Sequence, residues 1–148
     1  MANMVVMSKI LTIREKEKKD AQHAYQLSIN QFERIGTKMY ELLRKKEVAE
    51  QAYEESLQAS TNITSIQEHM EYMEFINKQI NNLQQAVQQA RTEMEAKQSK
   101  LTNAHVEMKK FEKLIEYRNI DQANQEKRLE NAQMDEISVQ QFLSYQNR

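Results

Sequence analysis

The sequence contains no cysteine, no proline and no tryptophan, and it has a single glycine. Without cysteine, the chain has neither a disulfide framework nor a thiolate metal site. The lack of proline and the near lack of glycine remove the two residue types that most often end or kink a helix. The chain is instead rich in Gln, Glu, Lys, Ala, Met and Leu, which favour helices. The composition therefore predicts a helical protein.

Long hydrophobic runs and a strong net charge are also missing. Apolar residues make up 39% of the chain, and no stretch approaches the roughly 20 consecutive apolar residues of a membrane-spanning helix. The apolar run at the start is too short for a signal peptide and has no small-residue cleavage site. A formal net charge of -1 provides no basic field for nucleic acid. We expect a cytoplasmic protein with protein partners, no nucleic acid and no direct membrane insertion.

The only cluster of short polar residues reads ASTNITS, at residues 59–65. Such side chains compete for backbone hydrogen bonds and favour caps and turns. The sequence therefore predicts a first helix over about 5–58, a bend over about 59–65 and a second helix over about 66–140. Thr64 or Ser65 would cap the second helix, with Glu68 completing a capping box.

Apolar residues after the bend recur on a seven-residue repeat, which indicates a left-handed coiled coil. Its positions are Met73, Ile76, Ile80, Leu83, Val87, Ala90, Met94, Leu101, Ala104, Met108, Phe111 and Ile115. Before the bend the repeat runs through Leu11, Ala21, Tyr25, Phe32, Ile35, Met39, Leu42, Ala49 and Tyr53. Lys18, Ser28 and Lys46 interrupt it. We therefore predict an all-α fold, a single long antiparallel two-helix coiled coil (a helical hairpin) over residues 1–148.

The two repeats face each other when paired residue numbers sum to 122. Ala49 then meets Met73, and Leu42 meets Ile80. Under this register residue 4 pairs with Arg118, so the second helix would continue without a partner beyond about residue 120. Apolar repeat positions return in that unpaired stretch, at Leu129, Ala132, Val139 and Leu143.

No residues are spaced as a catalytic or metal-binding site. His23, His69 and His105 lie far apart, and the chain has no glycine-rich phosphate loop. A two-helix coiled coil also lacks a concave interior in which polar groups could be desolvated. We expect no enzymatic activity and no cofactor.

Charge and exposed aromatics distinguish the two ends of the predicted hairpin. Residues 47–77 hold seven Glu and no Lys or Arg, whereas residues 1–20 and 97–118 together hold eleven Lys or Arg against six Asp or Glu. This separation either orients the molecule in a partner's field or reflects the charge that all exposed helices carry. Tyr72 and Phe75 lie off the repeat near the bend, where they form a docking surface or pack against the first helix.

The whole chain resembles the FliJ family of flagellar export proteins. The resemblance is carried by the length of 148 residues and by the order and spacing of three stretches. These are YEESL at residues 53–57, YMEFINKQI at residues 72–80 and KRLENAQMDE at residues 127–136.

The resemblance implies a fold like the rotary ATPase central stalk and a place in the flagellar type III export apparatus. The open end of the hairpin would bind the export ATPase hexamer and promote its assembly and activity. The opposite part would bind the cytoplasmic domain of the export gate, and the protein would escort export chaperones. It would lie peripherally at the cytoplasmic face of the membrane, at the flagellar base.

Matching positions supply candidate residues for the gate contact, and the basic open end with the unpaired part of the second helix supplies those for the ATPase contact. The gate-docking candidates, with Tyr72 included, are Leu42, Lys46, Ala49, Tyr53, Tyr72, Phe75, Gln79, Asn82 and Ala86. The candidates at the open end are Arg14, Lys18, Lys109, Lys127, Arg128, Asp135 and Glu136. Lys46, Ala49 and Gln79 are polar or small where the family is often apolar or aromatic.

Two other classes of function fit a helical hairpin. A general structural coiled coil would use its exposed apolar positions to form dimers or scaffolds, which light scattering would detect. A helical arm that binds RNA is disfavoured by the acidic residues near the bend, and it would show binding that persists only at low salt.

Overall fold

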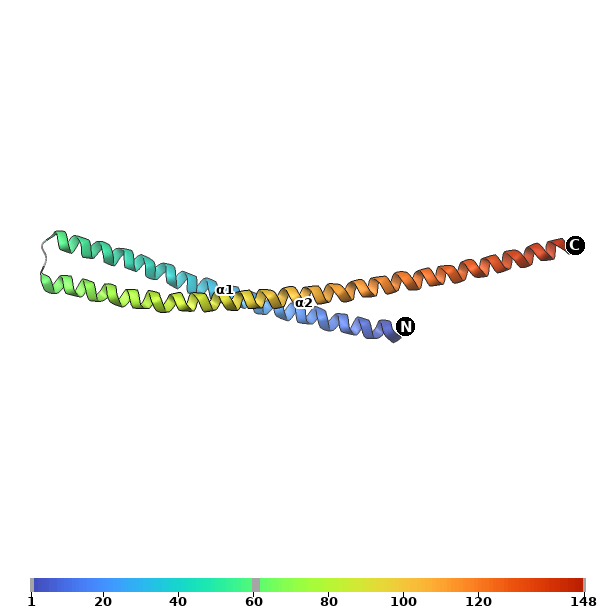
Figure 1. Cartoon of the computed structure of the whole chain (residues 1–148), viewed down its shortest axis with the longest axis horizontal. Coiled ribbons are helices and arrows are strands. Elements are labelled where there is room, and N and C mark those ends of the chain that lie inside the picture. Colours follow the sequence, from blue (N-terminus) through green and yellow to red (C-terminus); the bar gives the residue numbers. More distant parts are fainter. Residues whose placement is uncertain (1, 60–61, 148) are drawn as a thin grey trace. The chain divides into compact units, whose positions relative to one another are not determined.

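The computed structural model describes residues 2–59 and 62–147, which form two α-helices, α1 (Ala2–Gln58) and α2 (Ile63–Gln146) (Figure 1). Two long helices packed against each other, with no strand among the described residues, confirm the predicted helical hairpin. The chain divides into two compact units. We call Lys19–Asn103 the bend unit, and Met1–Lys18 with Ala104–Arg148 the terminal unit.

The start of α2 differs from the prediction. Asn62 is the N-cap, because its side-chain oxygen accepts a hydrogen bond from the Thr64 backbone N–H at 3.3 Å. Its carbonyl accepts the Ile66 N–H at 3.2 Å, the first hydrogen bond of the helix. Thr64 and Ser65, the predicted caps, instead lie inside the first turn. Asparagine is among the strongest N-caps, and each residue added to a formed helix gains a backbone hydrogen bond, so the helix begins at the earlier position.

The helices end close to the predicted bend on one side, and α2 runs further toward the end of the chain than predicted on the other. The last turn of α1 is closed by the Ala59 N–H, which donates to the Glu55 carbonyl at 3.0 Å. At the other end α2 continues to Gln146, past the expected limit near residue 140. Residues 60 and 61, which belong to the predicted bend, lie outside the described residues.

The core of the bend unit is the seam between α1 and α2. Ala49, Ile76 and Ile80 are its buried cluster, with Met39, Leu42 and Met73 packed against it. This cluster contains both partners of the predicted pairs Ala49–Met73 and Leu42–Ile80. Ile76 is only 1% exposed, so its burial contributes about 1.5–3 kcal/mol.

The polar residues that interrupt the α1 repeat belong to the seam. Ser28 is buried, as is Ser56, a further polar residue of α1. Their hydroxyls donate to the carbonyls of Tyr25 and Tyr53 at 2.6 and 2.8 Å. A serine that bonds its own helix in this way leaves no hydroxyl unsatisfied in an apolar layer. Lys46 is half-buried, with its ammonium 3.9 Å from the Glu50 carboxylate. The repeat therefore continues through these positions rather than stopping at them.

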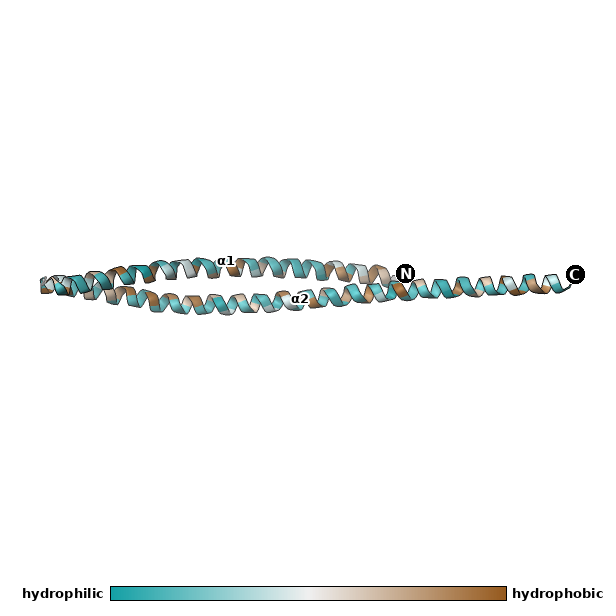
Figure 2. Cartoon of the chain, turned by 90° about the horizontal axis from the view of Figure 1, so that it is seen from above, coloured by the Kyte–Doolittle hydropathy of each residue, from teal (hydrophilic) through white to brown (hydrophobic). Residues whose placement is uncertain are grey.

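The terminal unit has a shorter seam and a long exposed helix. On α2 its half-buried or buried apolar residues are Ala104, Met108, Phe111 and Ile115. From Glu116 to Asn147 every residue is exposed. Hydrophobic residues nevertheless recur along this stretch of α2 (Figure 2). As the register predicted, α2 continues here without a partner within the described chain.

Candidate docking surfaces of the two units

One side of the bend unit, which we call the groove face, carries two neighbouring hollows. The first, of about 390 Å³, is lined by Arg44, Lys45, Val48, Ala49, Ala52, His69 and Tyr72. The second, of about 400 Å³, is lined by Lys38, Glu41, Leu42, Lys45, Gln79, Asn82 and Leu83. Lys45 belongs to both linings, so the hollows adjoin along α1. The face offers a partner two adjacent recesses.

Small side chains on α1 create the first hollow. Ala49 and Ala52 present only methyl groups where α1 faces the larger His69 and Tyr72 of α2. Their short side chains leave the flank of the seam unfilled, and Val48, which is 67% exposed, forms an apolar edge. An alanine in a coiled-coil layer thus produces a recess that a partner's side chain could fill.

The structure collects five of the nine predicted gate-docking residues in these hollows. Ala49 and Tyr72 line the first, whereas Leu42, Gln79 and Asn82 line the second. The other four lie outside the two linings. Among these, Lys46, Tyr53 and Ala86 are half-buried, and Phe75 is 55% exposed on α2. Their docking role stays a prediction.

Sequence reasoning missed part of the α1 side of the groove face. Lys38, Arg44, Lys45 and Val48 line the hollows but were not among the candidates. For Lys38, Lys45 and Val48 the available signal was a position one residue from a seam residue, on the flank that faces the Tyr72 and Gln79 side of α2. With Glu41, the charged residues of the linings are three cations and one carboxylate. The groove face is therefore cationic, although residues 47–77 carry a large excess of glutamate.

Arg14 is held inside the terminal unit. Its guanidinium lies 5.6 Å from the centre of the Phe111 ring and 2.9 Å from the Glu17 carboxylate. Its Nε is buried with no hydrogen-bond partner. The side chain thus joins α1 to α2 by a cation–π contact, which constrains it against turning outward.

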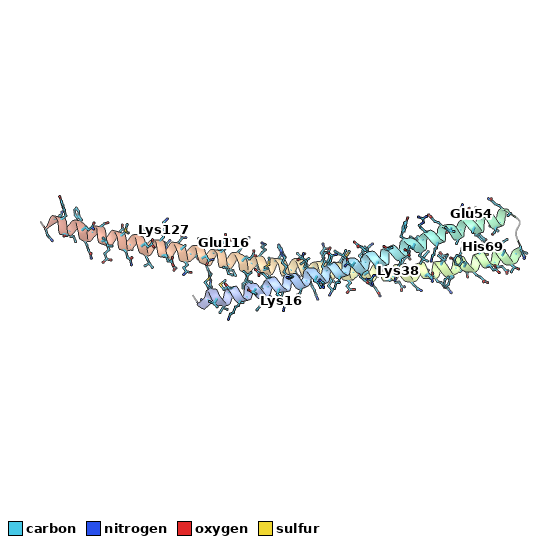
Figure 3. The ribbon with its side chains drawn as sticks, turned by 180° about the vertical axis from the view of Figure 1, so that it is seen from behind. Lys16, Lys38, Glu54, His69, Glu116 and Lys127 are labelled. Atoms are coloured by element: carbon cyan, nitrogen blue, oxygen red, sulfur yellow. The ribbon has the colours of Figure 1, made fainter. Side chains whose placement is uncertain are left out.

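The other candidates at the open end differ in exposure. Lys18 is half-buried, and the Lys109 ammonium lies 3.0 Å from the Glu112 carboxylate while its side chain stays half exposed. The last four, Lys127, Arg128, Asp135 and Glu136, are exposed on α2 beyond its seam. Lys127 is labelled on that stretch in Figure 3, which also labels Lys16 on α1 and Glu116 on α2.

The exposed stretch of α2 carries two apolar stripes. The predicted stripe consists of Leu129, Ala132, Val139 and Leu143. A second one, which sequence reasoning missed, consists of Met134, Ile137 and Tyr145. The sequence did indicate it, because Met134, Ile137 and Tyr145 are spaced by three and eight residues, and this spacing places side chains on the same side of a helix. Such apolar surface on a helix without a partner makes this stretch a candidate interaction site.

The described residues show no features of a metal or membrane site. No group of three or more His, Cys, Asp or Glu gathers in the parts of the chain that the structure describes. Of the three histidines, His69 is half-buried and lines the first hollow. Figure 3 labels it near the first turns of α2. Neither described helix has an apolar stretch long enough to cross a bilayer.

Comparison with known proteins gives matches along the whole length. The family model described as flagellar FliJ protein matches residues 4–147. The flagellar FliJ protein of Bacillus subtilis (strain 168) is 33% identical over 143 residues, which are 97% of this chain and 97% of that protein. No solved structure matches the chain.

Proposed function

Because this chain belongs to the flagellar FliJ protein family, we propose that it is a stalk-like, non-enzymatic coiled coil that connects the export ATPase to the export gate. As a member of this family it is a component of the flagellar export apparatus. The observation that most supports a connecting role is that each of its two units carries a separate exposed surface suited to a partner.

The terminal unit is the proposed contact with the export ATPase hexamer. Every residue of α2 from Glu116 to Asn147 is exposed, and the stretch includes the stripe of Leu129, Val139 and Leu143. An isolated helix gains most of its stability from packing an apolar stripe against a partner. Seating the stripe in the hexamer would bury it and bring Lys127, Arg128, Asp135 and Glu136 beside the ATPase. Binding there would promote hexamer assembly and activity.

The groove face is the proposed contact with the cytoplasmic domain of the export gate. It combines recesses with exposed apolar and aromatic groups, notably Val48, Tyr72 and Phe75. Aromatic residues that fill or border pockets are the usual anchors of a protein interface. Lys38, Arg44 and Lys45 add a cationic border, so an acidic surface on the gate would fit. In this account the protein works peripherally at the cytoplasmic face of the membrane and escorts export chaperones.

ATP hydrolysis by the purified flagellar export ATPase tests the first contact, measured with and without this chain alongside sedimentation of the ATPase. We expect both turnover and the hexamer fraction to rise. Truncation after Asp121 removes both apolar stripes, so it should abolish the rise. The substitution Phe75→Ala, in the bend unit, is the control and should leave it intact. Equal stimulation by the truncated and full chains would contradict the assignment.

The exposed stripes of α2 also favour an alternative, in which the chain is a structural coiled coil that forms dimers or scaffolds. In that case the stripe of Met134, Ile137 and Tyr145 would pair with a second copy. Light scattering separates the two functions, because the connecting role predicts a monomer over a wide concentration range. A dimer that the truncation after Asp121 converts to a monomer would support the scaffold.

A further inference from the structure

The flank of the bend unit opposite the groove face carries an apolar patch beside the connection between the helices. Its exposed members are Leu57 (49% exposed) on α1, and Ile63 (72%) and Met70 (46%) on α2. Ile66, between the last two, is half-buried. Ile63, Ile66 and Met70 have the spacing i, i+3, i+7, so they form one stripe along the first two turns of α2.

The helical period places this patch away from the groove face. Each residue turns an α-helix by about 100°, so residues two apart point to nearly opposite sides. Met70 therefore lies about 200° around α2 from Tyr72, which lines a groove-face hollow. On α1, Glu54 has the same relation to Ala52. The two flanks are distinct surfaces, and a partner on one leaves the other free.

Carboxylates border the patch. Glu47, Glu50 and Glu54 lie on the same flank of α1 as Leu57, and Glu74 lies beyond Met70 on α2. Lys46 lies 3.9 Å from Glu50, and residues 47–77 contain no lysine or arginine. We call these four glutamates with Leu57, Ile63, Ile66 and Met70 the acidic flank. Its charge is opposite in sign to that of the groove-face linings.

We propose that the acidic flank is a second docking surface of the bend unit, which binds an amphipathic helix whose apolar stripe is bordered by lysine and arginine. A helix laid along the seam would place its apolar side chains against Leu57, Ile63 and Met70. Its cations would face the glutamates on either side, which gives the charge complementarity that steers and selects a partner. Anionic partners such as nucleic acid or a phospholipid surface would be repelled by the same carboxylates.

This surface is independent of the contacts proposed for the export ATPase and the gate. Those contacts use the exposed stretch of α2 and the groove face, whereas the acidic flank uses other residues of the bend unit. A negative result in the ATPase measurement would therefore not contradict peptide binding at the acidic flank. Likewise, a failure of peptide binding would not contradict the ATPase contact.

Binding of a synthetic peptide to the full chain tests the proposal. The probe is a fluorescent helical peptide with a leucine stripe bordered by lysines, and a second peptide carries glutamate in place of each lysine. We expect the lysine peptide to bind the full chain and the glutamate peptide to bind at least about tenfold more weakly. Affinity for the lysine peptide should fall with salt, because exposed charge pairs are screened.

Matched variants locate the binding. Leu57→Ser with Met70→Ser should weaken binding of the lysine peptide by about tenfold or more, because two of the three exposed apolar residues of the patch are lost. Glu47→Lys with Glu54→Lys should weaken it similarly and flatten its salt dependence. Val48→Ser on the groove face and Glu126→Lys with Glu130→Lys on the exposed stretch of α2 are the controls, and they should bind as the parent does. Circular dichroism of each variant confirms that the helices are retained.

Three results would overturn the proposal. One is equal weakening by either control: by Glu126→Lys with Glu130→Lys, which would show a general attraction to negative charge, or by Val48→Ser, which would place the peptide on the groove face. Another is equal binding of both peptides. The third is sedimentation that shows the parent as a dimer and the Leu57 and Met70 double variant as a monomer, because the patch would then be covered by a second copy of the chain.

Discussion

Ile76 is the most buried residue of the bend unit, and replacing it with alanine tests whether the seam around it holds α1 and α2 together. The side chain is 1% exposed and lies in one cluster with Ala49 and Ile80. Truncation of isoleucine to alanine in a core costs about 2–5 kcal/mol, depending on how far the site collapses. Met39 and Met73 pack against this cluster and are flexible enough to move into the space. We therefore expect a loss of about 2–3 kcal/mol.

Urea denaturation followed by circular dichroism measures this loss. Ile137→Ala is the matched control, because it is the same substitution in the same helix at a residue that is 52% exposed. It should change the free energy of unfolding by no more than about 0.5 kcal/mol. Equal effects of the two substitutions would refute the reasoning, since they would show that burial in this seam does not determine stability.

Three further substitutions test the contribution of other contacts to the stability of the two helices. Asn62→Ala removes the N-cap of α2 and should cost about 1 kcal/mol in thermal or urea unfolding, whereas Asn77→Ala, at an exposed position within the helix, should not. Arg14→Ala removes the contact with Phe111 and the ion pair with Glu17, so we expect the free energy of unfolding to fall by about 0.5–1 kcal/mol. Amide hydrogen exchange should become faster in the terminal unit alone, and unchanged exchange would contradict this. Ser28→Ala should be neutral or stabilising by up to about 0.5 kcal/mol, because the Tyr25 carbonyl keeps its helical hydrogen bond and alanine favours helix. A fall of more than about 1 kcal/mol in the free energy of unfolding would show that the serine hydroxyl is needed.

The fold could be predicted almost completely because one signal, the seven-residue apolar repeat, determines it. Every apolar residue that the repeat selected on α2, from Met73 to Ile115, is buried or half-buried. The cap of α2 was predicted less well. Asn62, Thr64 and Ser65 all have capping side chains, and the choice among them depends on where the first backbone hydrogen bond forms, which the residue types alone do not determine.

The candidate surfaces were only partly predictable. A repeat identifies the seam, so Tyr72 and Phe75 stood out because they lie off it. The hollows also depend on which flank small residues leave unfilled, and this requires the pairing of both helices. Ala49 was a candidate, but the recess beside it is completed by Lys45, Val48 and Ala52. A count of the charges in residues 47–77 likewise could not show that the groove face is cationic and the opposite flank acidic, because the two faces draw their residues from both helices.

Site-specific photo-cross-linking in the assembled export apparatus tests the central claim, that the two units hold different partners, most directly. A photoreactive amino acid replaces Val139 on the exposed stretch of α2 in one variant and Gln79 in the second groove-face hollow in another. The account predicts that the probe at position 139 labels the export ATPase and the probe at position 79 labels the cytoplasmic domain of the export gate. Labelling of the same partner from both positions, or with the partners exchanged, would contradict it.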